Sequence, residues 1–187
     1  MSWLGTAWLV PLYPLVGSAS SLLWSPGLIK RSGPRPSGYI NLLMVSVAFA
    51  HSLLALLSLH NNSAAGASAI YAPPSFGWTW INTAGLRIGF DGLVSEPALI
   101  AMTVITGLHV LVQIYSIGYL EMDWGWPRFF GSLSFFEAGL CGLVLTDSVF
   151  FSYVLLELLT VSTRPHRPAS KKLRAPKKRG QPQSISR

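Results

Sequence analysis

The sequence of 187 residues has little charge and almost no cysteine. Charged residues make up 11% of it and hydrophobic residues 50%, with a mean hydropathy of +0.44. A soluble domain would carry about 25% charge, so this composition is typical of a membrane protein. The single cysteine, Cys141, excludes an intrachain disulfide and a cysteine-rich metal site. We expect Cys141 to pack as a small apolar side chain.

The sequence also lacks the motifs of nucleotide-binding and hydrolytic enzymes. It has no P-loop, no dinucleotide fingerprint, no nucleophile elbow and no cysteine or histidine spacing that suits a metal. We therefore expect no cofactor site in this chain. The N-terminus has neither the basic residues nor the small-residue cleavage site of a signal peptide, so the residues from Trp3 onward are interpreted as a first membrane span.

Positive charge is concentrated at the C-terminal end. Residues 164–187 hold nine of the fourteen Lys and Arg, whereas residues 1–163 hold five basic and seven acidic residues. The net charge of +7 therefore does not indicate a nucleic-acid-binding body. We expect the Pro-containing segment 164–187 to be a disordered tail. Its basic run is either adventitious charge or a site for anionic lipid, since it has no aromatic residue to stack on bases.

Five apolar segments predict an all-α membrane protein with about five transmembrane helices in residues 1–163. The predicted spans are 3–24, 39–60, the segment from the Ser95 cap to about 120, 129–145 and 148–163. Between the second and third spans, alternation over Phe76–Phe90 predicts a β-hairpin with a four- or five-residue loop around 82–85. Ser95 and Ser148 are the expected helix N-caps.

Basic residues in the loops predict the orientation. The loop 25–38, the connector 121–128 and the tail fall on one side with three, one and nine basic residues, and the other side has only Arg87. The positive-inside rule then places the tail in the cytosol. The N-terminus and the hairpin, whose tryptophans suit a membrane interface, would face the lumen or periplasm.

One carboxylate stands in the middle of the last apolar segment. Glu157 lies ten residues past Asp147, about 15 Å along a helix, and no basic residue is close to it in sequence. A lone acid near the bilayer centre is costly and indicates a functional group, here a proton relay. The alternative is a Glu that a neighbouring helix binds for packing alone. Tyr153 and Thr160 share its helix face and could orient it or hold a water.

Two other polar residues in the spans are candidate relay or supporting groups. His109 belongs to a stripe on one helix face with Thr106, Gln113 and Ser116, for which interhelical hydrogen bonding is the alternative role. Glu137 lies roughly 12 Å into its span and is either a relay on the proton-uptake side or a packed polar residue, with packing favoured. His51 has no evident polar companion and is interpreted as structural.

Several segments resemble chain 5 of the type I NAD(P)H-quinone oxidoreductases, the antiporter-like membrane subunit, and most closely its cyanobacterial form. They are Asp91–Leu93, Thr106–Leu108, Gln113–Phe130, Phe136–Cys141 and Leu145–Leu159. The resemblance covers residues 1 to about 163 and implies a proton-pumping module in a thylakoid or bacterial inner membrane, with other membrane subunits as partners. It implies that Glu157 stands where the family has a glutamate central to proton transfer. Nicotinamide, iron–sulfur clusters and quinone would then bind to other subunits.

The resemblance ends at Thr163. The family continues with apolar helices that carry further lysines, whereas Arg164 begins the basic tail. This change predicts a frameshifted or truncated gene, and the genomic DNA after codon 163 tests that hypothesis. Two functions are therefore considered: a proton-translocating subunit of the quinone oxidoreductase, including its carbon dioxide uptake variant, and a non-catalytic membrane fragment with a lipid-binding tail.

Overall fold

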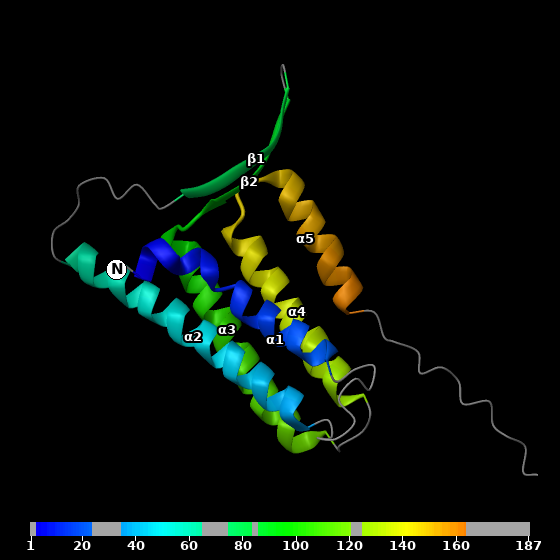
Figure 1. Ribbon diagram of the computed structural model, residues 1–187. Helices are drawn as coiled ribbons and strands as arrows, with labels where there is room; N and C mark the ends of the chain where they lie inside the picture. The colour runs from blue at the N-terminus through cyan, green and yellow to red at the C-terminus, as the bar shows by residue number, and fades with distance from the viewer. Residues whose placement is uncertain (1–2, 24–34, 65–74, 84–85, 121–124, 164–187) are drawn as a thin grey trace, which may run out of the picture.

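The computed structural model describes residues 3–23, 35–64, 75–83, 86–120 and 125–163. Within these ranges the chain is mostly helical and has one small sheet (Figure 1). The predicted tail, 164–187, lies outside the described residues. The elements in chain order are η1 (Trp3–Leu9), α1 (Leu12–Leu22), α2 (Arg35–Ala64), β1 (Ser75–Thr83), β2 (Leu86–Leu93), α3 (Glu96–Tyr119), α4 (Trp126–Leu145) and α5 (Val149–Ser162).

Helices α1 to α4 pack side by side around an apolar core, and α5 lies at the edge of this bundle against α4 (Figure 1). Cys141 is a buried free thiol in the core, as predicted. Small and aliphatic side chains from η1, α2, α3 and α4 make up much of the rest, among them Leu4, Ala7, Ala48, Ala55, Leu99, Met102 and Leu145.

Three helical segments are long and apolar enough to cross a membrane, namely Pro36–Asn61, Glu96–Tyr119 and Trp126–Leu145. The prediction of a helical membrane protein is thus confirmed, but the number of such helices in the described residues is lower than five. The first predicted span is divided into η1 and an α1 of 11 residues, because Pro11 between them has no N–H to continue a helix. The described α5 has 14 residues, about 21 Å of helix against a hydrocarbon core of about 30 Å.

The hairpin is confirmed, but its loop is shorter than predicted. β1 and β2 pair antiparallel from Ser75↔Leu93 to Thr83↔Leu86, so only residues 84 and 85 lie between the strands. Asn82, predicted to be in the loop, instead pairs with Arg87, because a two-residue connection is enough to close an antiparallel ladder.

The start of α4 and the cap of α5 differ from the predictions. α4 begins at Trp126, three residues before the predicted Phe129, because a proline in the first turn (Pro127) does not disturb a helix. Ser95 caps α3 as predicted, and its Oγ accepts a hydrogen bond of 3.4 Å from the N–H of Ala98. Ser148 occupies the N-cap of α5 but makes no side-chain cap hydrogen bond. Its own N–H donates to Thr146 Oγ1 at 3.4 Å instead.

The base of the hairpin is bonded to the corner between α4 and α5. The carbonyl of Asp91 accepts the N–H of Asp147 at 2.9 Å and the hydroxyl of Thr146 at 3.3 Å. Gly92 and Thr146 also form an isolated antiparallel bridge. One end of α5 is therefore anchored to β2 as well as to α4.

Candidate functional site

Two glycines of α4 form the surface on which α5 packs. A Cβ on Gly139 would lie 2.9 Å from Leu159 Cδ2, and a Cβ on Gly142 would lie 3.4 Å from Leu155 Cδ1. Small residues let membrane helices approach closely in this way, and both leucines are buried. Leu155 and Leu159 therefore define the inner face of α5.

Glu157 lies on the opposite, outer face of α5. Successive helix residues are about 100° apart, which places Glu157 about 180° from the middle of the inner face. Its side chain is exposed, as are those of Tyr153 (62%) and Thr160. The predicted common face of these three residues is confirmed. The burial expected for Glu157 is not provided by the described residues, because α5 is an edge helix with only one of its faces covered.

Thr160 and Tyr153 flank Glu157 on this outer face. The hydroxyl of Thr160 donates to the carbonyl of Leu156 in its own helix at 3.0 Å. That bond uses the hydroxyl hydrogen within the helix and leaves the oxygen able to accept a further hydrogen bond. The outer face thus presents a carboxyl group between two hydroxyl groups within an otherwise apolar helix.

The buried acid of the bundle is Glu137. Its side chain is 0% exposed, and neither carboxylate oxygen has a hydrogen-bond partner among the described residues. Gly139 and Gly142 face α5, so Glu137, roughly opposite to them on α4, points toward the interior of the bundle.

Glu137 and Glu157 therefore point away from each other across two packed helices. An interaxial distance of about 8–10 Å and about 5 Å of side chain on each far side put their carboxyl groups on the order of 20 Å apart. Direct proton transfer between them is excluded at this distance. Glu137 is thus not an immediate donor to Glu157.

The polar stripe of α3 faces neighbouring helices, as predicted. Thr106 Oγ1 lies 3.1 Å from Ser52 Oγ of α2, and Gln113 Nε2 donates to Ser134 Oγ of α4 at 3.0 Å. His109 is different: its Nδ1 binds the carbonyl of Ile105 in its own helix at 3.0 Å. Its ring centroid lies 6.0 Å from that of Phe136. Interhelical bonding thus accounts for Thr106 and Gln113, whereas His109 makes no interhelical hydrogen bond to a described residue.

His51 has two polar partners that sequence reasoning missed. Its Nε2 lies 3.1 Å from Thr6 Oγ1, and its Nδ1 lies 3.1 Å from the hydroxyl of Tyr13. The interpretation that His51 lacks polar companions is wrong because the partners precede it by 45 and 38 residues. The signal available in the sequence was the spacing of Thr6 and Tyr13, seven residues or two helical turns apart.

A His51→Leu variant is expected to loosen the N-terminal segment from α2. Two hydroxyl groups would lose their partner, at a cost of about 1–2 kcal/mol. The apparent melting temperature in mild detergent measures the loss, and His60→Leu is the control because His60 is exposed in α2. Equal melting temperatures for the two variants would contradict this role of His51.

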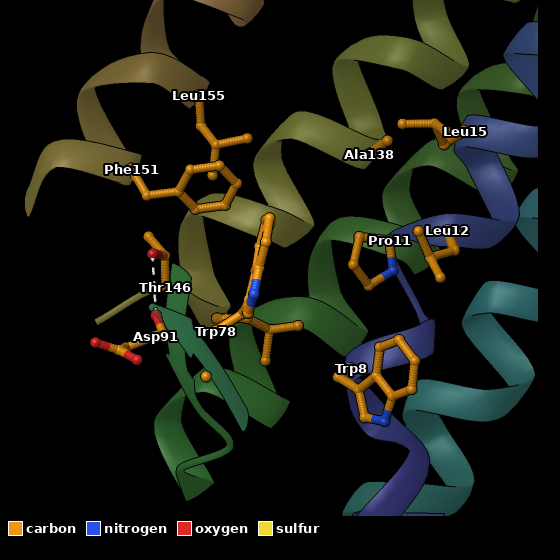
Figure 2. A pocket seen from close by; sticks show the side chains of 13 residues that line it. Trp8, Pro11, Leu12, Leu15, Trp78, Asp91, Ala138, Thr146, Phe151 and Leu155 are labelled. Carbon is orange, nitrogen blue, oxygen red and sulfur yellow. Dashed lines mark hydrogen bonds between the residues drawn. The ribbon is translucent and has the colours of Figure 1, made fainter. Parts of the chain in front are cut away.

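An apolar pocket lies where α1, α4, α5 and the hairpin meet (Figure 2). Its volume is about 460 Å³, and Trp8, Trp78 and Phe151 are among the side chains that line it. Asp91 is its only acidic lining residue, and no group of metal-ligating side chains occurs in the described parts of the chain. The pocket therefore offers a surface for hydrocarbon and no acid–base pair.

Comparison with known proteins shows what the chain is similar to. Residues 80–130 match the family model "NADH-Ubiquinone oxidoreductase (complex I), chain 5 N-terminus". An organellar chromatophore form of NAD(P)H-quinone oxidoreductase subunit 5 from Paulinella chromatophora is 42% identical over 157 residues, which is 84% of this chain and 24% of that relative. The chloroplast subunit 5 of Mesostigma viride is 35% identical over 82% of this chain and 22% of its own length. The chain thus spans about a quarter, or less, of the length of these relatives.

Proposed function

We propose that the chain corresponds to the N-terminal part of subunit 5 of the NAD(P)H-quinone oxidoreductases and is a membrane component of a proton-translocating complex of this type. Its similarity to the Paulinella relative extends over 84% of its length. Three apolar helices suit such a component. The electron-transfer chemistry, with nicotinamide, iron–sulfur clusters and quinone, belongs to other subunits in this proposal.

The observation that carries the proposal is the direction of Glu157. It lies at the ninth position of the 14-residue α5 and faces away from α4. A carboxyl group in an apolar membrane helix does not face lipid without a large cost, so another helix or a water-filled path covers it in the assembled protein. The outer face of α5 is then both the interface with the rest of the complex and the place where a proton is handed on. Tyr153 and Thr160 supply hydroxyl groups that orient the carboxyl group or hold a water beside it.

The proposed orientation places the starts of α2 and α4 in the cytosol or stroma. Arg35 and Arg128 lie in the first turns of these two helices, at the end of the bundle away from the hairpin. Basic residues favour the cytosolic side, so the hairpin would face the lumen. The exposed Trp78 and Trp80, at 66% and 58%, suit that membrane surface. The chloroplast and chromatophore relatives favour a thylakoid membrane, and the carbon dioxide uptake variant is one form that the complex could take.

Co-purification tests the proposal. A tagged chain, extracted from its native membranes with a mild detergent, is expected to bring down other membrane subunits of the oxidoreductase. Mass spectrometry of the eluate identifies them, and extraction in a denaturing detergent is the control. Recovery of the chain alone, together with salt-sensitive binding to anionic liposomes through residues 164–187, would instead support the non-catalytic fragment.

A further inference from the structure

We infer that the bundle of α1 to α4 contains a second proton-binding site, a row of buried acceptors along α4 that holds ordered water and ends at Glu137. The site is separate from Glu157, which carries the proposed function. It also differs from the alternative considered for Glu137, that of a residue packed for structure alone.

Four buried oxygen atoms within the bundle have no hydrogen-bond partner among the described residues. They are Asn41 Oδ1, Gln113 Oε1 and both carboxylate oxygens of Glu137, and all three side chains are fully buried. Exchanging the amide nitrogen and oxygen of Asn41 would not give its unpartnered oxygen a hydrogen bond. Its Nδ2 donates at 2.7 Å to the carbonyl of Ser37, which can only accept. These four oxygen atoms are acceptors, whereas the other unpartnered buried side-chain atom among the described residues, Trp126 Nε1, is a donor.

Asn41 and Gln113 are linked through their amide nitrogens to groups beside two successive turns of α4, and Glu137 lies on the next turn. Asn41 donates to Ser21 Oγ, and the Cβ of Ser21 lies 3.1 Å from the position of a Cβ on Gly131. Gln113 donates to Ser134 Oγ at 3.0 Å. Gly131, Ser134 and Glu137 are each three residues apart, so the row extends for about 9 Å along α4 and turns about 120° around it. That length corresponds to about three hydrogen-bonded waters at roughly 2.8 Å each.

Water is the donor that suits this row. A buried acceptor without a partner costs about 1–3 kcal/mol, and buried water typically satisfies such groups with about three hydrogen bonds. The basic residues of the described helices, Arg35 and Arg128, lie in first turns, and Arg128 is about 13.5 Å along α4 from Glu137. A single carboxylate without other ligating groups is a poor metal site, and no metal-ligating cluster occurs in the part of the chain described.

A row of acceptors also favours a protonated Glu137. Each water accepts as well as donates. The O–H of Ser21 already donates to the carbonyl of Gly17 at 3.3 Å, whereas Ser134 accepts from Gln113 and can still donate its own O–H. The protonated carboxyl group supplies the O–H that the adjacent water needs. An ionised Glu137 would instead be a buried charge without a partner among the described residues.

The titratable groups that the described helices contribute to the interior of the bundle include no permanent cation. They are Tyr13 on α1, His51 on α2, His109 on α3 and Cys141 one turn along α4. His51 is held by Thr6 and Tyr13, and His109 binds Ile105 in its own helix. Glu137 therefore exchanges its proton through the water row and not with a fixed ion-pair partner.

Infrared difference spectroscopy tests the inference on the protein as purified from its membranes with the subunits that accompany it. The wild type is expected to show the C=O band of a protonated carboxylic acid, one component of which disappears in Glu137→Gln and persists in Glu157→Gln. When the protein is mixed with D2O, the frequency of this component is expected to shift as the carboxyl proton exchanges for deuterium. In Gln113→Leu, which interrupts the row, the shift is expected to be at least tenfold slower. Thr103→Val is the control, because Thr103 lies on the same helix and binds its own Leu99 carbonyl.

Each alternative outcome of this experiment decides against the inference. A spectrum in which Glu137→Gln removes no component would show that Glu137 is not a protonated acid. Exchange in Gln113→Leu at the wild-type rate would show that no water row connects these residues. If Gln113→Leu does not assemble, Ser134→Ala makes the same test with a smaller change. Proton pumping is recorded separately, so that a failure of the relay role of Glu157 can be distinguished from a failure of the inference about Glu137.

Discussion

Glu157→Gln is expected to lower proton pumping at least tenfold while the chain still assembles with its partners. Glutamine has the size and hydrogen-bonding capacity of a protonated glutamate, but it cannot release a proton. Positioned acid–base groups contribute about 10²- to 10⁴-fold to proton-transfer steps, and a tenfold loss corresponds to about 1.4 kcal/mol in the barrier. Quenching of a pH-sensitive dye in membrane vesicles measures pumping, with quinone reduction recorded in parallel.

Glu96→Gln is the matched control for this experiment. Glu96 is an exposed acid in the first turn of α3 and lies outside both polar faces described above. Its replacement is expected to leave pumping unchanged. Tyr153→Phe and Thr160→Val are expected to have smaller effects than Glu157→Gln, because they remove an orienting hydroxyl group and not the carrier. Undiminished pumping in Glu157→Gln, in a complex of normal composition, would refute the relay role.

Gly139→Leu is expected to displace α5 from α4 and reduce pumping nearly as much as Glu157→Gln. Even a Cβ at this position would lie 2.9 Å from Leu159 Cδ2, and a leucine adds three more carbons. Overpacking of this kind costs about 1–3 kcal/mol and moves the elements apart. The acid would then be intact but wrongly placed. Pumping and the protease sensitivity of the α4–α5 corner measure the effect.

A second substitution separates steric displacement from other causes. In the double variant Gly139→Leu with Leu159→Ala, space is returned at the same contact, and pumping is expected to recover in part. Gly118→Leu is the control for helix propensity, since no atom lies within 4 Å of a Cβ at Gly118 in α3. A double variant as impaired as Gly139→Leu alone would show that this contact does not position α5.

Local sequence patterns were sufficient to predict most of the helices and the hairpin. Long apolar runs predicted α2, α3 and α4, alternation predicted the hairpin, and the serine before Glu96 predicted the cap of α3. These features depend on residues within a few positions of one another. The division of the first span, the two-residue hairpin connection and the earlier start of α4 were missed, because each depends on how a backbone tolerates one proline or closes one ladder.

The two acids show the limit of sequence reasoning at the site. Spacing placed both Glu137 and Glu157 deep in their helices, and it favoured packing for Glu137 and a proton relay for Glu157. In the structure Glu137 is fully buried, whereas Glu157 is exposed on a face of α5 that no described residue covers. Position along a helix axis can be counted from the sequence, whereas the direction around it relative to neighbours depends on packing. Gly139 and Gly142 determine that direction, and their contacts with α5 are not encoded in either helix alone.

The bond between Asp91 and Asp147 has a consequence for biosynthesis. The ribosome adds residues from the N-terminus, so β2 is complete more than 50 residues before Asp147 emerges. The nascent hairpin can therefore already offer its free carbonyl when the turn after α4 leaves the insertion machinery. The first turn of α5 then forms next to β2, which is already folded, and this contact restricts the position of that turn.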